Sequence, residues 1–232
     1  MKVLKRIIDH YSNKIWQKKR SQFVQKLREM NADCEAPSIL SCNCTGGVMA
    51  HELGMRFMSP TVNLFMDCPD FIKLCERLEY YLSLDPVKSE HSLAWHLKDK
   101  NIDGSNTEGE YPVLLLDDLT LFMVHYHSFE EAQNKWNERK KRIDLNNIRI
   151  IATDRDGCTA ELKQRFENLP YPRVMFTHTE EIYYPHCFYL RGCEAEGQTD
   201  ALRKDGALTG KRLYDQFNWV EFIRNGQYSA AD

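Results

Sequence analysis

The sequence predicts an α/β fold in which a mixed sheet lies between layers of helices. Short runs of β-branched, aliphatic and aromatic residues alternate with longer amphipathic segments, which is typical of layered α/β proteins. The chain has 232 residues, of which 42% are hydrophobic, and this is enough apolar side chain to build a core. Its length fits one large domain or two small α/β halves that pack together.

Residues 1–35 are expected to form a basic amphipathic helix ahead of a single α/β domain over residues 36–232. Apolar side chains recur at helical spacing along residues 4–27. Residues 1–30 contain nine Lys or Arg and two Asp or Glu residues, a charge of +7, whereas the whole chain has a net charge of −3. Such a helix either covers the domain, with its charges solvated, or makes peripheral contact with an anionic membrane surface. The acidic remainder of the chain argues against nucleic acid as a partner.

The elements after this helix follow from local patterns. Strands are expected where β-branched, aliphatic and aromatic residues cluster, over residues 37–40, 61–66, 112–116, 119–126, 147–153, 173–176 and 187–190. Helices are expected over residues 48–56, 69–82, 129–142, 159–169 and 215–224. Pro69 suits a first helical turn, and Ser128 with Glu131 forms a capping box. The polar, turn-rich segment 99–111 is the best candidate for an internal boundary.

No apolar run in the sequence approaches the roughly 18–20 residues that span a bilayer. The first residues also lack the apolar stretch and the cleavage site of a secretory signal. We therefore expect a cytoplasmic protein, which is peripheral at the inner membrane face if the first helix binds lipid. In that compartment the eight Cys residues are expected to be thiols and not disulfides.

The segment Ser41–Gly47 (SCNCTGG) lies between a predicted strand and a predicted helix. Glycines at that place let backbone N–H groups approach a phosphate, which the positive end of the helix favours, and polar side chains add hydrogen bonds. The predicted phosphate- and substrate-binding residues here are Asn43, Thr45, Gly46, Gly47 and, on the helix, His51. A tight turn that needs flexible glycines is the alternative. The two cysteines of this segment and His51 do not have a usual zinc spacing.

Asp154 and Asp156 directly follow a predicted strand. In extended backbone, residues two apart point to the same side, so both carboxylates can meet one hard cation such as Mg²⁺ or Mn²⁺. That cation would neutralise the diphosphate of a nucleotide sugar and assist its departure. The alternative interpretation is an ordinary turn, because Asp-Gly pairs are also typical of turns.

His125 and His127 also lie two residues apart, near the end of a predicted strand. One of them could be a general base, or the two could be metal ligands. The next helix carries Trp136, Arg139 and Arg142 at spacings of three. Arginines suit phosphate or carboxylate groups, and tryptophan suits a sugar face or a nucleobase. The alternatives are a hydrogen-bonded core histidine and a buried tryptophan beside solvated arginines.

Several motifs together resemble one protein family. They are the segment 41–47 with HELG at 51–54, SPTVNL at 59–64, and HY at 125–126 with SFEEA at 128–132 and WxxRK at 136–140. The resemblance continues through IIATDRDG at 150–157 and FTH at 176–178, so it covers about residues 36–225. The family is an uncharacterised bacterial domain family that is often labelled exopolysaccharide biosynthesis protein. Membership implies work on surface polysaccharide, and it assigns no reaction or catalytic residues.

These observations lead us to expect a glycosyl- or related group transferase that uses a nucleotide-activated sugar. His125 or His127 would deprotonate the acceptor hydroxyl, the two aspartates would hold the metal ion, and segment 41–47 would hold phosphate. Two other classes remain open, a non-catalytic carbohydrate-binding or membrane-surface scaffold and a metal-dependent hydrolase built around the two histidines. Convergence of these motifs at one place favours an enzyme, whereas their scatter favours the scaffold.

Overall fold

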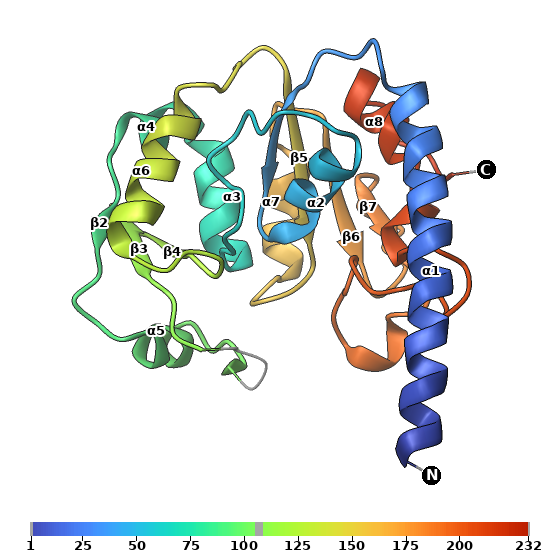
Figure 1. Cartoon of the computed structure of the whole chain (residues 1–232). Coiled ribbons are helices and arrows are strands. Elements are labelled where there is room, and N and C mark those ends of the chain that lie inside the picture. Colours follow the sequence, from blue (N-terminus) through green and yellow to red (C-terminus); the bar gives the residue numbers. More distant parts are fainter. Residues whose placement is uncertain (1, 105–108, 232) are drawn as a thin grey trace.

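The computed structural model describes residues 2–104 and 109–231, and it contains two β-sheets flanked by helices (Figure 1). The strands are β1 (Ser38–Ser41), β2 (Val87–Lys88), β3 (Val113–Leu116), β4 (Leu119–Phe122), β5 (Ile148–Thr153), β6 (Arg173–Thr177) and β7 (Cys187–Tyr189). The α-helices are α1 (Lys2–Met30), α2 (Cys44–Glu52), α3 (Cys68–Glu76), α4 (Leu78–Ser83), α5 (Leu93–Asp99), α6 (Phe129–Lys140), α7 (Ala160–Glu167) and α8 (Trp219–Asn225). Two short 3-10 helices, η2 (Glu194–Glu196) and η3 (Leu213–Gln216), lie near the C-terminus.

The strands divide into a parallel and an antiparallel sheet. The parallel sheet has the order β1-β5-β6-β7, and the antiparallel sheet has the order β2-β3-β4. Strands β1 and β5 are far apart in the sequence and pair in register from Ser38 with Ile148 to Ser41 with Ile151. The predicted α/β fold is therefore confirmed, with its parallel and antiparallel strands in separate sheets.

Strand β5 has a hydrophobic cluster on each of its faces. Ile150 lies in one cluster and Ile151 in the other, because successive residues of a strand point to opposite faces. Both side chains are fully buried. The cluster around Ile150 also contains Leu114 of β3 and Trp136 of α6, so it joins the two sheets. The cluster around Ile151 contains Phe222 of α8 and covers the opposite face.

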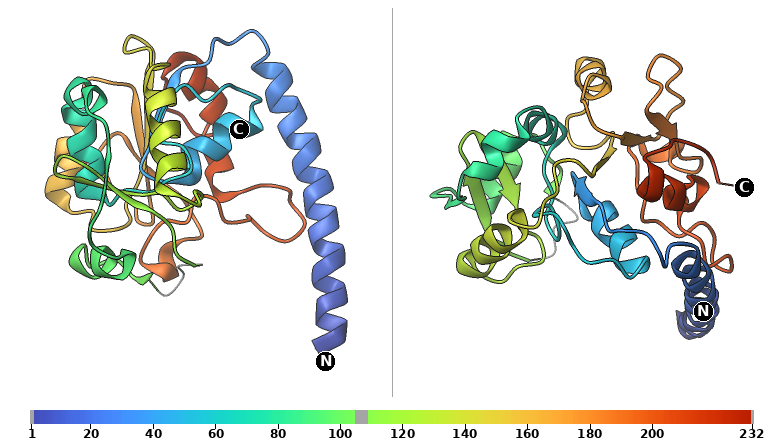
Figure 2. Two further views of the ribbon diagram at one scale, coloured as in Figure 1. Left: turned by 60° about the vertical axis from the view of Figure 1, so that its left-hand side comes forward. Right: turned by 90° about the horizontal axis from the view of Figure 1, so that it is seen from above.

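Helix α1 packs along one edge of the molecule, and its N-terminal turns extend beyond the body (Figures 1 and 2). Arg20, which is only 6% exposed, fixes its second half to the body. The guanidinium pairs with Glu52 of α2 and with Asp215, and it donates a hydrogen bond to the Tyr214 hydroxyl at 2.6 Å. Trp16 is buried as well. Across residues 2–104 and 109–231, none of the helices is long and apolar enough to cross a membrane.

The segment between α2 and α3 differs from the prediction, because residues 61–66 do not form the expected strand. Phe65 alone makes a β-bridge, with Phe122 of β4. Asn63 has a φ of +65°, which lies outside the extended region. Side chains hold this segment instead, and the Tyr126 hydroxyl donates a hydrogen bond to the Val62 carbonyl at 2.8 Å.

Helix α2 begins four residues earlier than predicted, so the two glycines lie in its first turn and not in a loop. Asn43 is the N-cap, and its Oδ1 accepts a hydrogen bond from the Thr45 N–H at 3.0 Å. A helix can start here because the Asn side chain satisfies one of the free N–H groups at its end. The phosphate-loop geometry expected for segment 41–47 is therefore replaced by a capped helix N-terminus.

Other helix and strand boundaries differ from the predicted ones by smaller amounts. The predicted helix over residues 69–82 divides at Arg77 into α3 and α4. One half of the predicted capping box of α6 is present, because the Ser128 hydroxyl accepts a hydrogen bond from the Glu131 N–H at 3.1 Å. The Glu131 carboxylate accepts from the His127 N–H and not from the Ser128 N–H. Strand β2 and helix α5 were not expected, and α5 ends where the predicted boundary segment 99–111 begins. Residues 105–108 of that segment lie outside the described residues.

Candidate active site

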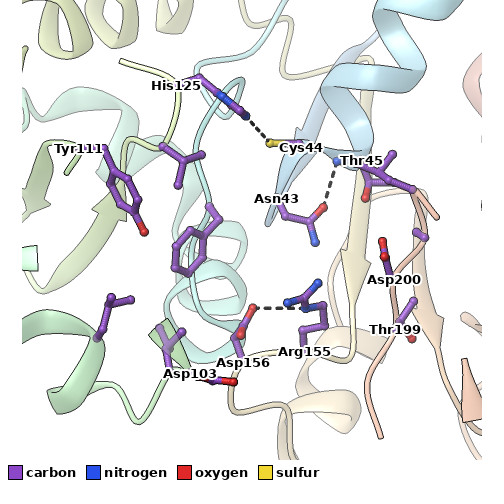
Figure 3. Close-up of a pocket in the computed structure, with 16 residues that line it drawn as sticks. Asn43, Cys44, Thr45, Asp103, Tyr111, His125, Arg155, Asp156, Thr199 and Asp200 are labelled. Carbon is purple, nitrogen blue, oxygen red and sulfur yellow. Dashed lines mark hydrogen bonds and ion pairs between the residues drawn. The ribbon is translucent and has the colours of Figure 1, made fainter. Parts of the chain in front are cut away.

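A cavity of about 460 Å³, which we call the central pocket, opens between the two sheets (Figure 3). One side comes from segments that follow parallel strands, namely residues 43–45 after β1, 155–156 after β5 and 199–202 after β7. The other side comes from the antiparallel half and includes Phe65, Leu97, Ile102, Asp103, Tyr111, Val124 and His125. In α/β proteins, ligands commonly bind outside the carboxyl ends of the parallel strands, and this cavity occupies that position.

The start of α2 supplies Asn43, Cys44 and Thr45 to the central pocket. Two of these were predicted, and the Asn43 side chain is fixed at both ends, because its Nδ2 also donates a hydrogen bond to the Thr153 hydroxyl at 2.9 Å. Gly46 serves packing: a Cβ there would lie 2.7 Å from the Ser41 Cβ, so only glycine lets the helix approach β1 this closely. Gly47 faces Val62.

The two predicted histidines face different hollows. His125 lines the central pocket, where its Nε2 lies 3.4 Å from the Cys44 Sγ. Burial raises the pKa of the Cys44 thiol. His127 lines a second hollow of about 410 Å³, and its backbone N–H donates a hydrogen bond to the Glu131 carboxylate at 3.0 Å. A single reaction centre that uses both imidazoles therefore does not fit this arrangement.

The two predicted metal ligands are also separated in role. Asp156 lines the central pocket and has a φ of +53°, so the backbone is not extended as the prediction assumed. Burial raises the pKa of Asp156, and Arg155, whose Nε lies 3.9 Å from Oδ2, opposes that shift. The Asp154 carboxylate instead accepts hydrogen bonds from the His178 N–H at 2.9 Å and the Thr199 N–H at 3.2 Å. Within the described ranges, no group of three His, Cys, Asp or Glu side chains could hold a metal ion.

The remaining predicted residues lie outside the central pocket and hold the scaffold together. Trp136 is 1% exposed and belongs to the hydrophobic cluster between the sheets. Arg139 donates hydrogen bonds to the Val62 carbonyl at 3.2 Å and to the Tyr126 hydroxyl at 2.6 Å. Arg142 donates to the Phe57 carbonyl at 3.2 Å, so both arginines fix the segment before α3 to α6.

The other expected binding residue, His51, has an exposed side chain and lies in the last turn of α2. Its backbone carbonyl accepts a hydrogen bond from Arg28 of α1 at 3.2 Å. The residues of α2 that line the central pocket are in its first turn, at the opposite end of the helix, so His51 is not part of the pocket.

Several polar residues of the central pocket were not predicted. Arg155 was overlooked between two aspartates, although a cation next to carboxylates is a recognisable signal for a charged site. Two buried polar atoms have no hydrogen-bond partner in the part of the chain that the structure describes, namely the Nε of Arg155 and the hydroxyl of Thr199. The residue Thr199 is fully buried. Asp200 follows Thr199 and is half-buried. Their segment is far from any recognised motif, and only the fold brings it to the carboxyl ends of β1 and β5.

Comparisons with known proteins support the coarser expectation from the motifs, an uncharacterised bacterial domain family. A family model described as "Domain of unknown function (DUF1919)" matches residues 12–224, so the match includes the second half of α1, which the motif resemblance had left out. A protein of Haemophilus influenzae (strain Rd), described as an uncharacterized protein, is 31% identical over 209 residues, which are 90% of this chain and 94% of that protein. The chain therefore belongs to the DUF1919 family of bacterial proteins.

Proposed function

We propose that this protein is a group transferase of surface-polysaccharide assembly, and most simply a glycosyltransferase that uses a nucleotide-activated sugar. The observation that carries the proposal is convergence: Asn43, Thr45, His125 and Asp156 come from three distant segments and line one cavity. Motifs that meet at one pocket are the pattern expected of an active site and not of a scaffold surface. The resemblance of the motifs to exopolysaccharide biosynthesis proteins is the reason for proposing surface-polysaccharide assembly as the pathway.

The chemistry of the central pocket suits a sugar. Carboxylate, amide and hydroxyl groups accept or donate hydrogen bonds to sugar hydroxyls, and here they are supplied by Asp156, Asp200, Asn43 and Thr199. Aromatic and aliphatic side chains on the other side offer an apolar surface for the C–H face of a sugar ring, and Tyr111 lies among them (Figure 3). A mixture of apolar lining and a few convergent polar groups is typical of small-molecule sites.

The diphosphate of the donor would lie near Arg155 and the N-terminus of α2. Arg155 lines the central pocket, and guanidinium groups bind phosphate oxygens well. The positive end of a nine-residue helix favours the same charge. In this arrangement His125 is the base that removes the proton from the acceptor hydroxyl.

The proposal still includes Mg²⁺ or Mn²⁺, but the protein would supply one of the two predicted carboxylates as a ligand. Asp156 is the carboxylate of the predicted pair that lines the central pocket. Burial raises its pKa, and a cation beside it would oppose that shift as Arg155 does. Magnesium is commonly bound through one or two carboxylates together with substrate phosphates and water. A bound ion would supply charge neutralisation of the leaving diphosphate.

We also propose a cytoplasmic location with peripheral membrane contact through α1. The first half of this helix extends beyond the body (Figure 2), and Tyr11 and Ile15 are 62% and 45% exposed. Exposed apolar side chains on a helix with a charge of +7 over residues 1–30 suit an anionic lipid surface. This feature also favours the scaffold alternative, in which the protein binds saccharide and membrane without catalysis. The hydrolase alternative loses its basis, because His125 and His127 face different hollows.

The proposal is tested by a thermal-shift screen of UDP-glucose, UDP-galactose, UDP-N-acetylglucosamine, GDP-mannose and the free nucleotides, each with and without Mn²⁺. A ligand that binds only the native state stabilises it by about 2.7 kcal/mol at about 100 times its dissociation constant. We expect one donor to stabilise the protein in a Mn²⁺-dependent manner, and this shift to disappear in Arg155→Ala. The exposed control Arg6→Ala should keep it. Saccharide binding that survives Arg155→Ala and Asp156→Asn would favour the scaffold.

A further inference from the structure

Cys44 and His125 form a thiol–imidazole pair at the central pocket. The Sγ of Cys44 lies 3.4 Å from the Nε2 of His125, which is hydrogen-bonding distance for sulfur, and Figure 3 shows this contact between α2 and the segment after β4. The two residues are 81 positions apart in the sequence, so only the fold brings them together. A thiol next to an imidazole is the arrangement of a nucleophile with its base.

The position of Cys44 separates it from the other cysteines. Cys42, Cys68, Cys75 and Cys193 are buried and free of disulfides. Cys44 is the first residue of α2 and faces the cavity, at the helix end where a thiolate is favoured. Because burial raises the pKa of this thiol, it rests as S–H at neutral pH, and attack on a substrate needs a neighbouring base.

A second feature of the same cavity indicates that a polar ligand belongs there. The Thr199 residue is fully buried, lines the central pocket and has a hydroxyl without a hydrogen-bond partner in the described part of the chain. An unpaired buried hydroxyl costs free energy unless a ligand or water satisfies it. The Cys44 thiol, the His125 imidazole and this hydroxyl therefore surround a space suited to a polar molecule.

We propose that Cys44 is the nucleophile of the central pocket, with His125 as its base, and that it carries the transferred sugar as an S-glycosyl intermediate. The identity of the electrophile rests on the function proposed above. In the first step the thiol proton passes to Nε2, the Sγ–C1 bond forms and the C1–O bond to the diphosphate breaks. The nucleoside diphosphate leaves with the electron pair of that bond.

In the second step the hydroxyl oxygen of the acceptor attacks C1, and the Sγ–C1 bond breaks with its electron pair on sulfur. His125, which has lost the thiol proton to the departing diphosphate, takes the acceptor proton during this attack and passes it to the thiolate, so the thiol and the neutral base are both restored. Each step inverts the configuration at C1, so the product keeps the anomeric configuration of the donor. A direct attack of the acceptor on the donor would invert it.

The first test needs no substrate. Iodoacetamide is added to the folded protein at neutral pH, and the rate of alkylation of each cysteine is followed by peptide mass spectrometry. We expect Cys44 to react faster than Cys34, which is also partly exposed and has no imidazole partner in the described residues. His125→Asn should slow the reaction of Cys44 by roughly tenfold or more, whereas the matched variant His127→Asn should not change it. Equal rates in the two variants would overturn the pairing.

The second test uses the donors of the thermal-shift screen. The protein is incubated with each donor without acceptor, and we expect a mass increase of one sugar on the peptide that contains Cys44, absent in Cys44→Ser. Circular dichroism checks that both variants fold. Transfer with inverted configuration and no adduct would overturn the covalent step and leave the proposed function intact. If no donor binds or is turned over, the proposed function and the S-glycosyl step both fail, and the alkylation rates still decide whether Cys44 and His125 act as a pair.

Discussion

Asp154 and His178 are joined by two hydrogen bonds at the ends of β5 and β6. The carboxylate Oδ2 accepts one from the His178 N–H at 2.9 Å and one from its Nδ1 at 2.6 Å, and Oδ1 accepts a third from the Thr199 N–H at 3.2 Å. The side chain of Asp154 is 2% exposed. This carboxylate therefore ties the segment that carries Thr199 to the parallel sheet, and it positions one side of the central pocket.

Replacing this carboxylate should destabilise the fold. In Asp154→Asn the amide NH₂ would face an N–H donor, so at least one buried hydrogen bond is lost. We expect the free energy of unfolding to fall by about 1–3 kcal/mol, measured by urea denaturation. The exposed control Asp9→Asn should change it by less than about 0.5 kcal/mol. A variant of Asp154 that is as stable as the wild type but has lost Mn²⁺ binding would restore this residue to the metal site.

Asp156→Asn should behave in the opposite way. Asn tolerates the positive φ of this position, and the raised pKa of Asp156 shows that burial disfavours its charge, so a neutral amide should leave stability unchanged or slightly higher. We expect Mn²⁺-dependent stabilisation by the donor to be lost. Calorimetric titration with Mn²⁺ and donor measures this, and unchanged titration curves would remove Asp156 from the metal site.

Asp67 should make the stability depend on pH. Burial and the neighbouring Asp70 raise the pKa of Asp67 to about 6, although Lys100 lies 3.2 Å away. The folded state therefore binds this proton more tightly than the unfolded state, where the ordinary value is 3.8. Stability should fall as the pH rises from about 4 through about 6, because the ionised form is disfavoured in the fold.

The matched variant for this effect is Asp67→Asn. Asp67 is the N-cap of α3, where its Oδ1 accepts a hydrogen bond from the Asp70 N–H at 3.2 Å, and Asn caps helices equally well. We expect the melting temperature of the variant to change less than that of the wild type between about pH 4 and about pH 8. Parallel curves for the two proteins would show that another group governs this range.

Arg20 should be the strongest single contact between α1 and the body. Arg20→Ala leaves the carboxylates of Glu52 and Asp215 without their buried partner, which typically costs about 3–5 kcal/mol. The loss should show as a lower urea midpoint and faster proteolysis within residues 1–30. The exposed neighbour Lys18 provides the control, because Lys18→Ala changes the same helix without touching the network. Equal proteolysis of the two variants would mean that the other contacts of α1, among them those of Arg28, hold the helix in place without Arg20.

Much of the fold could be predicted because its signals are local. The run IRIIAT of β5 is mostly apolar and every residue in it is buried, as expected of a strand that is covered on both faces. The Ser128 cap needs only its neighbour at Glu131. The prediction of a strand over residues 61–66 was wrong because tertiary contacts determine the conformation of that segment. Asn63 turns the chain, and the Tyr126 hydroxyl donates a hydrogen bond to the Val62 carbonyl.

The candidate site was only partly predictable, because it depends on which segments meet. Asn43 and His125 were identified from local motifs, and both reach the central pocket. Asp154 was assigned to a metal because extended backbone was assumed through Asp156, whose positive φ breaks the alternation. Thr199 has no local signal at all, since its place at the pocket depends on a hydrogen bond to a residue 45 positions earlier.

The glycine pair at the start of α2 offers a test of how the pocket is positioned. Gly46→Ala would place a Cβ 2.7 Å from the Ser41 Cβ and 2.9 Å from the Ile39 Cγ2, whereas a Cβ at Gly47 meets its nearest atom, Val62 Cγ1, at 3.6 Å. The first variant forces α2 away from β1, and we expect it to lose about 1–3 kcal/mol of stability. It should also lengthen the contact between Cys44 and His125, because Cys44 precedes the displaced turn, and so slow alkylation of the thiol.

Gly47→Ala is the matched control, since alanine has the higher helix propensity and fits without strain. We expect it to be neutral or to stabilise the protein by up to about 1 kcal/mol, with unchanged alkylation of Cys44. If the glycines also served to let an anion approach the backbone, Gly47→Ala would keep its stability and would weaken donor binding. Donor binding by Gly47→Ala in the thermal-shift screen therefore separates a packing role from an anion-binding role.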